Sequence, residues 1–372
     1  MRHNKFKVLL LLLVITPLLA ACTVITGGSS TGTSAATTDS SLFFSQDKGD
    51  TWKAMANVPS LAGTPQTISD LNVNLLTMDP EDSKAIYLAS TDNGLYYTYT
   101  IGNGWTFVSS LPKTTINDIK VDPKNKCILY AAISNRVYRS ADCTRTWTQV
   151  YYDNNAGINV TSIVIDHYND QNIYIGTSRG EIIKSIDAGA SWRTIQNMDE
   201  GVAKLAMSPQ DSRLLFVATV KNHIFSFTSN TVTNAADSAN LEQNFLVENW
   251  TDLNAILSGY NLGSNFREML MAEDGTMFLA TDQVLVDSKD NGATWENIKL
   301  IQPDKGSTIN AFAINPQNSL ELYYVTNTTF FRSADGGATW TTKKLPTARA
   351  GQALLVDFAN PTALYLGTKK LK

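Results

Sequence analysis

One eight-residue pattern recurs along this chain and ends each time in tryptophan. It reads Ser-x-Asp-x-Gly-x-Thr-Trp, with one position varied, at residues 45–52, 185–192, 288–295 and 333–340, and a fifth copy at residues 140–147 has Thr144 in place of the glycine. All seven tryptophans end such a unit or stand where one is expected, at separations of 53, 42, 45, 58, 45 and 45 residues. A period of this size is typical of repeat proteins in which each repeat forms one small structural unit.

The residue types in this pattern are those of a tight turn followed by an anchor. An Asp carboxylate accepts hydrogen bonds from turn amides, Ser and Thr hydroxyls bond locally, and Gly adopts a positive φ without steric cost. A Trp ring can wedge between neighbouring sheets. We therefore expect a structural role for the Asp and Trp of the five copies, which are Asp47, Trp52, Asp142, Trp147, Asp187, Trp192, Asp290, Trp295, Asp335 and Trp340.

The segments between the turns have the composition of short strands. Residues 173–177 and 182–184 are rich in β-branched and aromatic side chains, and residues 160–166 supply a further strand of the same repeat. A second recurring turn, with Asp, Asn or Ser before Pro, separates the two inner strands of most repeats, because a strand does not continue through such a dipeptide. Four strands per period, repeated radially, predict a β-propeller.

The number of repeats predicts how the ring closes. Six full repeats occupy roughly residues 71–344, and only two inner strands follow, at 353–357 and 363–368. Before the first repeat, residues 41–45 and the strand from Thr51 supply two outer strands. We therefore predict an all-β, seven-bladed propeller of four-stranded antiparallel blades over residues 42–372, in which the N- and C-terminal strands share one blade.

The N-terminus has the features of an export signal. Three basic residues precede an apolar run, and Leu-Ala-Ala-Cys ends at Cys22. This order predicts a signal peptide over residues 1–21 and resembles the bacterial lipobox, which implies a lipid on Cys22. An ordinary signal peptide with a chance cysteine is the alternative. Residues 22–41 are rich in Ser, Thr and Gly and are expected to be a tether.

Charge and residue content argue against several functional classes. Without residues 1–21 the chain keeps 27 Lys and Arg against 34 Asp and Glu, a net charge of −7, which disfavours a nucleic-acid partner. The remaining histidines, His167 and His223, stand in separate repeats without metal-ligand spacing. We expect no metal, no cofactor and a monomeric chain.

The recurring turn resembles the Asp-box, or bacterial neuraminidase repeat. Sialidases with this repeat use a Phe/Tyr-Arg-Ile-Pro signature, whereas Phe266 and Arg267 are followed here by Glu-Met. Xyloglucanases with this repeat are similar but place two opposed carboxylates between two propellers, and the spacing of Asp70, Asp92 and Asp118 does not pair them.

Over its whole length the chain resembles the photosystem II stability/assembly factor family. That resemblance implies an exported seven-bladed propeller that acts as an assembly scaffold. We therefore predict a lipid-anchored, non-catalytic propeller at the cell envelope, on the cell surface or facing the periplasm, that binds an envelope protein or a surface glycan. A sialidase- or xyloglucanase-like glycoside hydrolase, or a glycan-binding module, is the alternative.

The two remaining cysteines lie in one repeat. If its hairpin folds about residues 134–135, Cys127 falls opposite residue 142, next to Cys143, so a disulfide is geometrically reasonable in an exported protein. Two free, buried thiols are the alternative.

The antiparallel order of the strands also predicts where a partner docks. The Asp-box turns share one face of the ring with the Asp-Pro turns, and the opposite face carries the other hairpin turns and the links between blades. Arginine and aromatic residues dominate binding hot spots. We therefore expect a partner on that opposite face, with Arg136, Arg179, Tyr260 and Arg267 as the binding residues; a merely solvated rim is the alternative.

Overall fold

The computed structural model describes residues 39–59, 66–229, 247–301 and 308–371. The chain divides into two compact units, Met1–Ala36 and Thr37–Lys372, and every described residue belongs to the second. The predicted signal peptide, Cys22 and most of the predicted tether therefore lie outside the described residues. Ser40 and Ser41, at the end of that tether, are buried, and their carbonyls accept hydrogen bonds from the Thr368 hydroxyl and amide at 2.8 Å each.

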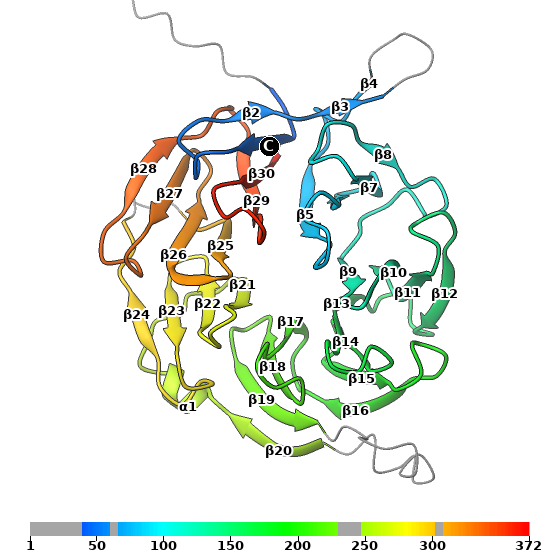
Figure 1. The fold of residues 1–372 in the computed structure, drawn as a ribbon. Coiled ribbons are helices and arrows are strands. Elements are labelled where there is room, and N and C mark those ends of the chain that lie inside the picture. Colours follow the sequence, from blue (N-terminus) through cyan, green and yellow to red (C-terminus); the bar gives the residue numbers. More distant parts are fainter. Residues whose placement is uncertain (1–38, 60–65, 230–246, 302–307, 372) are drawn as a thin grey trace, which may run out of the picture. The chain divides into compact units, whose positions relative to one another are not determined.

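The second unit is a ring of seven four-stranded antiparallel blades, which confirms the predicted fold class (Figure 1). Each of six blades is one continuous run of four strands, because each repeat supplies four short β-rich segments joined by tight turns. Blade 1 is β5 (Val73–Met78), β6 (Ile86–Ser90), β7 (Leu95–Thr98) and β8 (Thr106–Phe107); blade 2 is β9 (Asp118–Asp122), β10 (Asn125–Ile133), β11 (Arg136–Ser140) and β12 (Thr148–Tyr152); blade 3 is β13 (Val160–Ile165), β14 (Ile173–Thr177), β15 (Glu181–Ser185) and β16 (Arg193–Asn197).

The next three blades follow the same order. Blade 4 is β17 (Val202–Met207), β18 (Leu214–Thr219), β19 (Ile224–Ser229) and β20 (Val247–Asp252), with the short helix α1 (Asn254–Leu257) after it; blade 5 is β21 (Phe266–Met271), β22 (Met277–Thr281), β23 (Leu285–Ser288) and β24 (Glu296–Ile298); blade 6 is β25 (Ala311–Asn315), β26 (Asn318–Val325), β27 (Thr329–Ser333) and β28 (Thr341–Lys344).

The seventh blade joins the two ends of the ring. Its strand order is β2 (Lys53–Ala54), β1 (Leu42–Ser45), β30 (Leu364–Lys369) and β29 (Ala350–Val356), so two N-terminal strands complete two C-terminal ones. β1 pairs with β30 from Leu42↔Gly367 to Ser45↔Leu364. After β2, a small hairpin of β3 (Asn57–Val58) and β4 (Gln66–Thr67) leads into blade 1. Closure leaves no radial sheet edge between the first and last blades.

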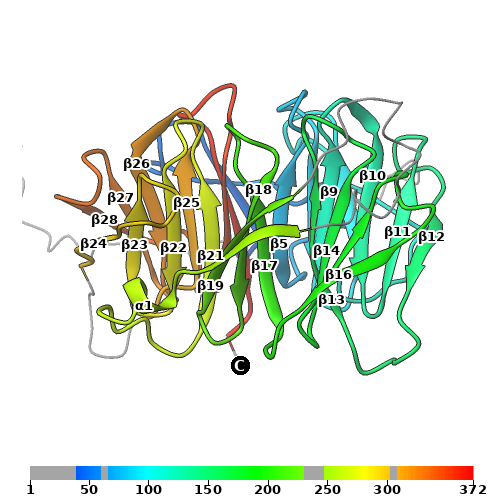
Figure 2. The same cartoon turned by 90° about the horizontal axis from the view of Figure 1, so that it is seen from below.

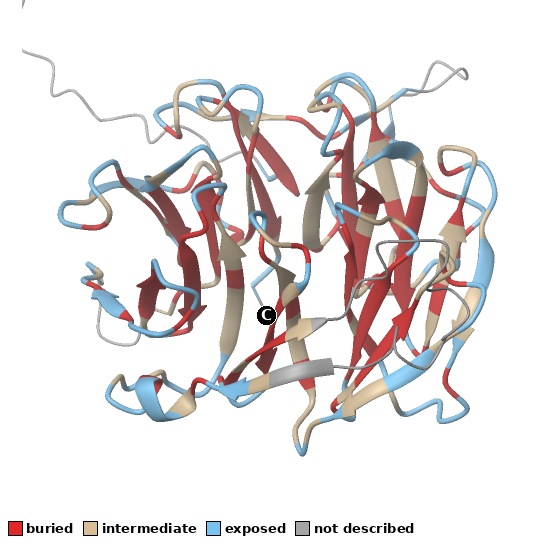
Figure 3. Ribbon diagram, turned by 60° about the horizontal axis from the view of Figure 1, so that its bottom comes forward, coloured by how far each residue is buried: buried red, intermediate tan, exposed pale blue. Residues whose placement is uncertain are grey.

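The hydrophobic core is divided among the blade interfaces. Seven clusters of buried side chains each join two neighbouring blades; one of them packs Tyr130 and Val137 of blade 2 against Val160 and Ile175 of blade 3. The second strands of blades 1, 3 and 5 are buried along their whole length, and the turns carry most of the exposed residues (Figure 3). The ring is therefore held by packing between sheets.

The two faces of the ring have different contents. The box face carries the turns between first and second strands and the Asp-box turns, which meet each other: the Ala188 amide bonds the Gln171 carbonyl at 3.0 Å. The link face carries the turns between second and third strands and the links from blade to blade, as where the Asp153 amide bonds the Asn135 carbonyl at 2.9 Å. Figure 2 shows the blades from the side, with these turns at opposite ends of the inner strands.

Each innermost strand begins with a bulge at the link face. In five blades the register shifts across one residue near the start of the innermost strand, as between Val73 and Leu75. In the other two blades, the amides of Asn117 and Asn310 donate to the carbonyls of Ala132 and Val325. Ala132 and Val325 are also the ladder partners of the residues that follow Asn117 and Asn310. One residue at the start of each innermost strand is therefore extra to the ladder, and a bulge of this kind re-aims its side chain.

Candidate functional site

The seven innermost strands line an axial channel. A hollow of about 340 Å³ opens toward the link face, and a second hollow of about 540 Å³ lies toward the box face. Both are lined by Asp118, Lys204, Glu268, Phe312 and Leu354, so they are two halves of one channel. The link-face half is the more polar; the box-face half carries Met78, Leu270, Met271, Leu355 and Phe358.

The bulged residues form one polar ring around the link-face end of the channel, which we call the mouth ring. Every blade contributes one member: Asn74, Asn117, Thr161, Ala203, Arg267, Asn310 and Gln352. Four of them bond the next blade. The amide nitrogens of Asn74, Asn117 and Asn310 donate to the carbonyls of Ile116, Val160 and Gly351 at 2.8, 2.9 and 3.0 Å, and the Thr161 hydroxyl donates to Val202 at 2.7 Å. The ring thus joins neighbouring blades and also faces the channel.

A second polar layer lies one residue deeper. Lys204 of blade 4 forms an ion pair with Glu268 of blade 5 at 2.8 Å, which joins the two blades where Ala203 cannot. Burial opposes the charge on Lys204, but Glu268 and then Asp118 more than offset it and raise the pKa of Lys204. Asp118 forms an ion pair with Lys120 at 2.8 Å and accepts the Ile163 amide of blade 3 at 2.8 Å. The acids of this layer are therefore engaged by cations and amides.

Arg267 is the cation of the mouth ring. Its Nε is buried without a hydrogen-bond partner, and within the described part of the chain its guanidinium forms no ion pair. Burial and then the charge of Arg267 lower the pKa of Lys369, at the end of β30. Asp118, Lys204 and Glu268 line the same hollow as Arg267, so this end of the channel carries both acids and bases.

Two other residues predicted for the link face lie together, away from the channel. Arg136 stacks on the Tyr152 ring, with its Cζ 5.2 Å from the ring centroid, and its Nε is buried without a partner. Arg179 bonds Asp153 at 2.8 Å and Glu181 at 2.7 Å, and these carboxylates raise the pKa of Arg179. Tyr152, Asp153 and Arg179 line a shallow hollow on this face.

Tyr260 is placed differently. Its hydroxyl donates to the Trp295 carbonyl, and its ring packs on the buried cluster that includes Leu253 and Leu257. It therefore sits between blades 4 and 5. The structure brings Arg136 and Arg179 to one patch, puts Arg267 in the channel, and leaves Tyr260 apart from both.

The five predicted Asp-box turns share one set of bonds. In each, the Asp carboxylate accepts the hydroxyl and the amide of the residue four positions on, and the hydroxyl bond is 2.6 Å long in all five. The first Ser accepts the amide at the glycine position at 2.8–3.0 Å. The tryptophans lie at blade interfaces. The indole N–H groups of Trp192 and Trp340 each donate, at 2.8 Å, to a backbone carbonyl on the side of the preceding blade.

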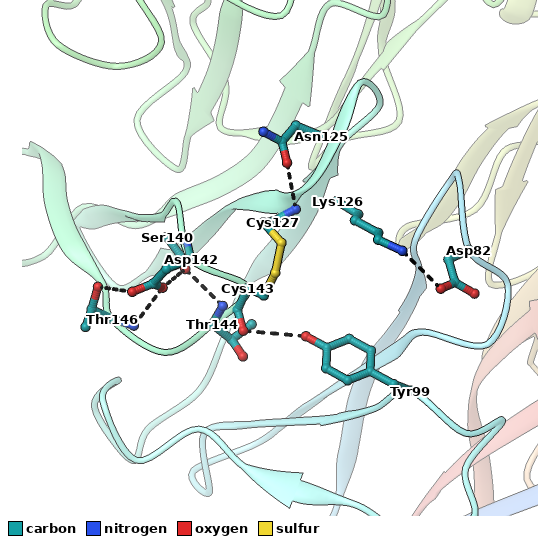
Figure 4. Close-up of a disulfide and its surroundings, with 10 residues drawn as sticks. All are labelled: Asp82, Tyr99, Asn125, Lys126, Cys127, Ser140, Asp142, Cys143, Thr144 and Thr146. Atoms are coloured by element: carbon teal, nitrogen blue, oxygen red, sulfur yellow. Dashed lines mark hydrogen bonds and ion pairs between the residues drawn. A yellow bond between two sulfur atoms is a disulfide. The ribbon is translucent and has the colours of Figure 1, made fainter.

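Cys127 and Cys143 form a disulfide beside the irregular box (Figure 4). Cys143 and Thr144 have positive φ angles, of 57° and 71°. Thr144 stands at the position that glycine, such as Gly337, occupies in the other boxes. The disulfide therefore ties the start of β10 to a turn in which a β-branched residue adopts a left-handed conformation.

The acids considered from the sequence are not grouped as a hydrolytic pair. Asp70 is exposed and bonds Lys370 at 2.8 Å, and Asp92 accepts the Thr115 hydroxyl at 2.9 Å. Asp118 lines the channel with Glu268, each in an ion pair. Among the described residues, no cluster of three or more His, Cys, Asp or Glu could hold a metal.

Sequence reasoning missed the mouth ring and Arg349. The Arg349 side chain is 4% exposed and joins blade 7 to the start of blade 1 through bonds to Thr368, Asn72 and the Leu71 carbonyl. Aligning the second residue of each inner segment would have revealed the ring, because six of its seven members are polar at the start of an apolar strand. Arg349 lies in a link with no repeated pattern.

No protein-family model matches the chain. A xyloglucanase of Paenibacillus sp. is 25% identical over 218 residues, which are 48% of this chain and 21% of that protein. Among solved structures, the GH74 xyloglucanase from Xanthomonas campestris has a TM-score of 0.61 and 16% identity, with 80% of this chain and 51% of that chain covered. YCF48 bound to a D1 peptide has a TM-score of 0.57 and 14% identity, with 81% and 94% covered.

These likenesses establish the propeller fold, which both an assembly factor and glycoside hydrolases share. The chain spans about a fifth of the curated xyloglucanase and about half of the GH74 structure, so their activity does not transfer with the fold. Separately, the part of the chain that the structure describes contains no helix long and apolar enough to cross a membrane.

Proposed function

We propose that this chain is a non-catalytic, protein-binding scaffold that is exported, anchored by a lipid on Cys22, and held at the cell envelope. The observation that carries the proposal is the link-face patch of Arg136, Tyr152 and Arg179. Tyr152 is 45% exposed although it is aromatic, and Arg136 is stacked on it at 5.2 Å. An exposed aromatic ring beside arginines is the composition of a binding hot spot.

The patch is rigid enough to recognise a partner. Asp153 is buried, and its backbone amide and carbonyl are both hydrogen-bonded to Asn135 in the adjacent hairpin turn. Its carboxylate forms an ion pair with Arg179 at 2.8 Å. Fixed arginine and tyrosine side chains lose little conformational entropy when they bind. The peptide-bound YCF48 structure shows that a propeller of this kind takes a peptide partner, which supports a protein ligand here.

The test is capture of envelope proteins from membranes by the full chain. We expect the Arg136→Gln/Arg179→Gln variant to lose the proteins that the wild type retains, because both cationic contacts go. The matched control is Lys289→Gln on the box face, an exposed residue that bonds Glu296 and Asp287. Equal recovery with both variants at equal thermal stability would contradict the docking surface. Cys22→Ser, run in parallel, should release the protein from membranes.

Glycoside hydrolysis is the second candidate, favoured by the xyloglucanase relative and the GH74 neighbours. Of the acids that line the channel, Asp118 and Glu268 would be its carboxyl pair. Each is already in an ion pair with a lysine at 2.8 Å, and Lys204 interacts with both. Release of reducing sugar from xyloglucan that Glu268→Gln abolishes would establish this candidate in place of the scaffold.

A further inference from the structure

We infer that the box-face half of the channel is a binding site for a hydrophobic amine, a small organic cation with an apolar body, whose ammonium group pairs with Glu273. The site opens on the opposite face of the ring from the patch of Arg136, Tyr152 and Arg179, so the inference does not depend on the partner of that patch. It rests on three features of the hollow of about 540 Å³: an apolar wall that is only half-buried, one carboxylate without a counter-charge, and a rim that is held in place.

The apolar wall is made by four consecutive blades. Their innermost strands, β21, β25, β29 and β5, follow one another around the channel (Figure 1). Six large apolar side chains that line the hollow from three of these strands are only half-buried, namely Leu76, Met78, Leu270, Met271, Leu354 and Leu355. A half-buried apolar wall in a hollow of this size is typical of a small-molecule site, and it favours an alkyl or aromatic body in the ligand.

The charged residues that line this half of the channel leave one carboxylate unpaired. They are three acids and two lysines: Asp118, Glu268, Glu273, Lys120 and Lys204. Lys120 forms an ion pair with Asp118, and Lys204 forms one with Glu268, each at 2.8 Å. Glu273 forms no ion pair with any described residue, so a cationic ligand would complete the charge balance through a charge-assisted hydrogen bond. An acidic ligand would have to separate one of the two existing ion pairs.

The rim beside Glu273 is held by bonds between neighbouring turns. Glu273 lies in the turn between β21 and β22, and its amide donates to the Pro316 carbonyl of blade 6 at 2.9 Å. The Gln317 side chain in turn donates to the Phe358 carbonyl of blade 7 at 2.9 Å. Pro316 and Phe358 also line the hollow. A ligand therefore meets a rim whose backbone is already ordered, and binding loses little conformational entropy there.

The experiment is calorimetric titration of the full chain with octylammonium, octanoate, ethylammonium and the peptide acetyl-Leu-Lys-amide. Octylammonium should bind at least about fivefold more tightly than octanoate, because only a positive charge complements Glu273. It should bind at least about tenfold more tightly than ethylammonium, which lacks the apolar body. Glu273→Gln should reduce the preference for octylammonium over octanoate to about twofold or less.

Two further variants separate the site from the general charge of this face. The matched control, Glu81→Gln, removes an exposed carboxylate from the equivalent turn of blade 1, outside the hollow, and should leave binding of all four probes unchanged. Leu76→Gln places an amide in the apolar wall and should weaken octylammonium about tenfold. Because Glu273 is exposed, Glu273→Gln should melt like the wild type, and it decides the test alone if Leu76→Gln does not fold.

Four outcomes would overturn the inference. These are no saturable octylammonium binding by the wild type, octanoate or ethylammonium bound as tightly as octylammonium, a Glu273→Gln variant that keeps the wild-type preference for octylammonium over octanoate, or Glu273-dependent binding of the peptide that is tighter than that of octylammonium. The last outcome would assign the hollow to a peptide. Because the titration uses only purified protein and small probes, its result is independent of the membrane capture experiment.

Discussion

The Asp-box turns and the mouth ring each consist of residues at equivalent positions in successive repeats. They differ in how far the residues at those positions are alike. Every box forms the same bonds, down to a 2.6 Å contact between the Asp carboxylate and a hydroxyl. The mouth ring places an amide at Asn74, a hydroxyl at Thr161, a methyl group at Ala203 and a guanidinium at Arg267 in equivalent positions. The boxes repeat one bond network in every copy, whereas the ring repeats a location and, in four of its seven members, a bond to the next blade.

This difference separates the residues that determine the fold, in the Asp-box turns, from the residues that distinguish one propeller from another, in the mouth ring. A turn that must reverse the chain at every blade has one good solution, so its residues recur. The ring positions are bulged out of the ladder and owe nothing to strand pairing, so their side chains can vary without loss of the sheet. We therefore expect changes on the box side to cost stability, and changes in the ring to alter binding.

The largest expected effect is Trp295→Ala on the box side. Trp295 is 5% exposed and packs in the cluster between blades 4 and 5, so its removal should lower the free energy of unfolding by about 3–5 kcal/mol. The matched control is Tyr152→Ala on the link face, where an exposed ring should cost about 0.5 kcal/mol or less. Denaturant unfolding of both variants measures this. A loss under about 1 kcal/mol for Trp295→Ala would mean that the tryptophans are not wedges.

The next effect concerns the one box that departs from the pattern. Cys127→Ser with Cys143→Ser removes a cross-link of sequence separation 16, which on chain-entropy grounds should cost about 3 kcal/mol. Adding Thr144→Gly should restore part of that loss, because φ is 71° there and the other boxes have Gly. The gain in stability from Thr144→Gly measures how much of the loss comes from backbone strain at this position.

Mass spectrometry of the unreduced protein tests the bond itself. Two alkylatable thiols at Cys127 and Cys143 would contradict the disulfide and with it the expected loss. An unchanged unfolding free energy in the double-serine variant, with the bond present in the wild type, would show instead that the turn is held by its own hydrogen bonds.

The fold could be predicted from the sequence because its determinants are local and repeated. The period of the tryptophans, the turn residues and the half-blades at the two ends sufficed for seven blades and for the closure of β1 on β30. Adjacency of Cys127 and Cys143 followed from hairpin register in the same way.

The site could be predicted only in part. Arg136 and Arg179 were expected on the link face from strand order, and the structure brings them to one patch there. The burial of Tyr260 against the start of β24 depends on how far the outer strands of blades 4 and 5 tilt, which no local pattern encodes. The mouth ring depends on contacts between residues of neighbouring blades, such as Asn74 and Ile116, which are 42 positions apart, and these contacts become visible only when the ring is closed.

The smallest expected effect is a decline of the melting temperature at acid pH, which we attribute to the carboxylates of the Asp-box turns and not to those of the Asp-Pro turns. Hydrogen bonds from the Thr51 and Thr339 hydroxyls, and then from the amides of the same residues, lower the pKa of Asp47 and of Asp335 to about 2. Burial instead raises the pKa of Asp79 and Asp122 in the Asp-Pro turns. The two kinds of turn should therefore respond to acid with opposite signs.

A carboxyl with a lowered pKa binds a proton less readily in the folded than in the unfolded protein, so its contribution to stability is present above the unfolded value of 3.8 and is lost as the pH falls toward 2. The melting temperature should thus decline between about pH 4 and pH 2. Thr51→Val with Thr339→Val keeps both carboxylates but removes the largest cause of the shift, so the decline should be shallower and should end at a higher pH. Asp47→Asn with Asp335→Asn should lower the melting temperature at neutral pH and flatten the decline. Acid transitions that coincide in all three proteins would assign the decline to other groups and would end the contrast between box and inner turns.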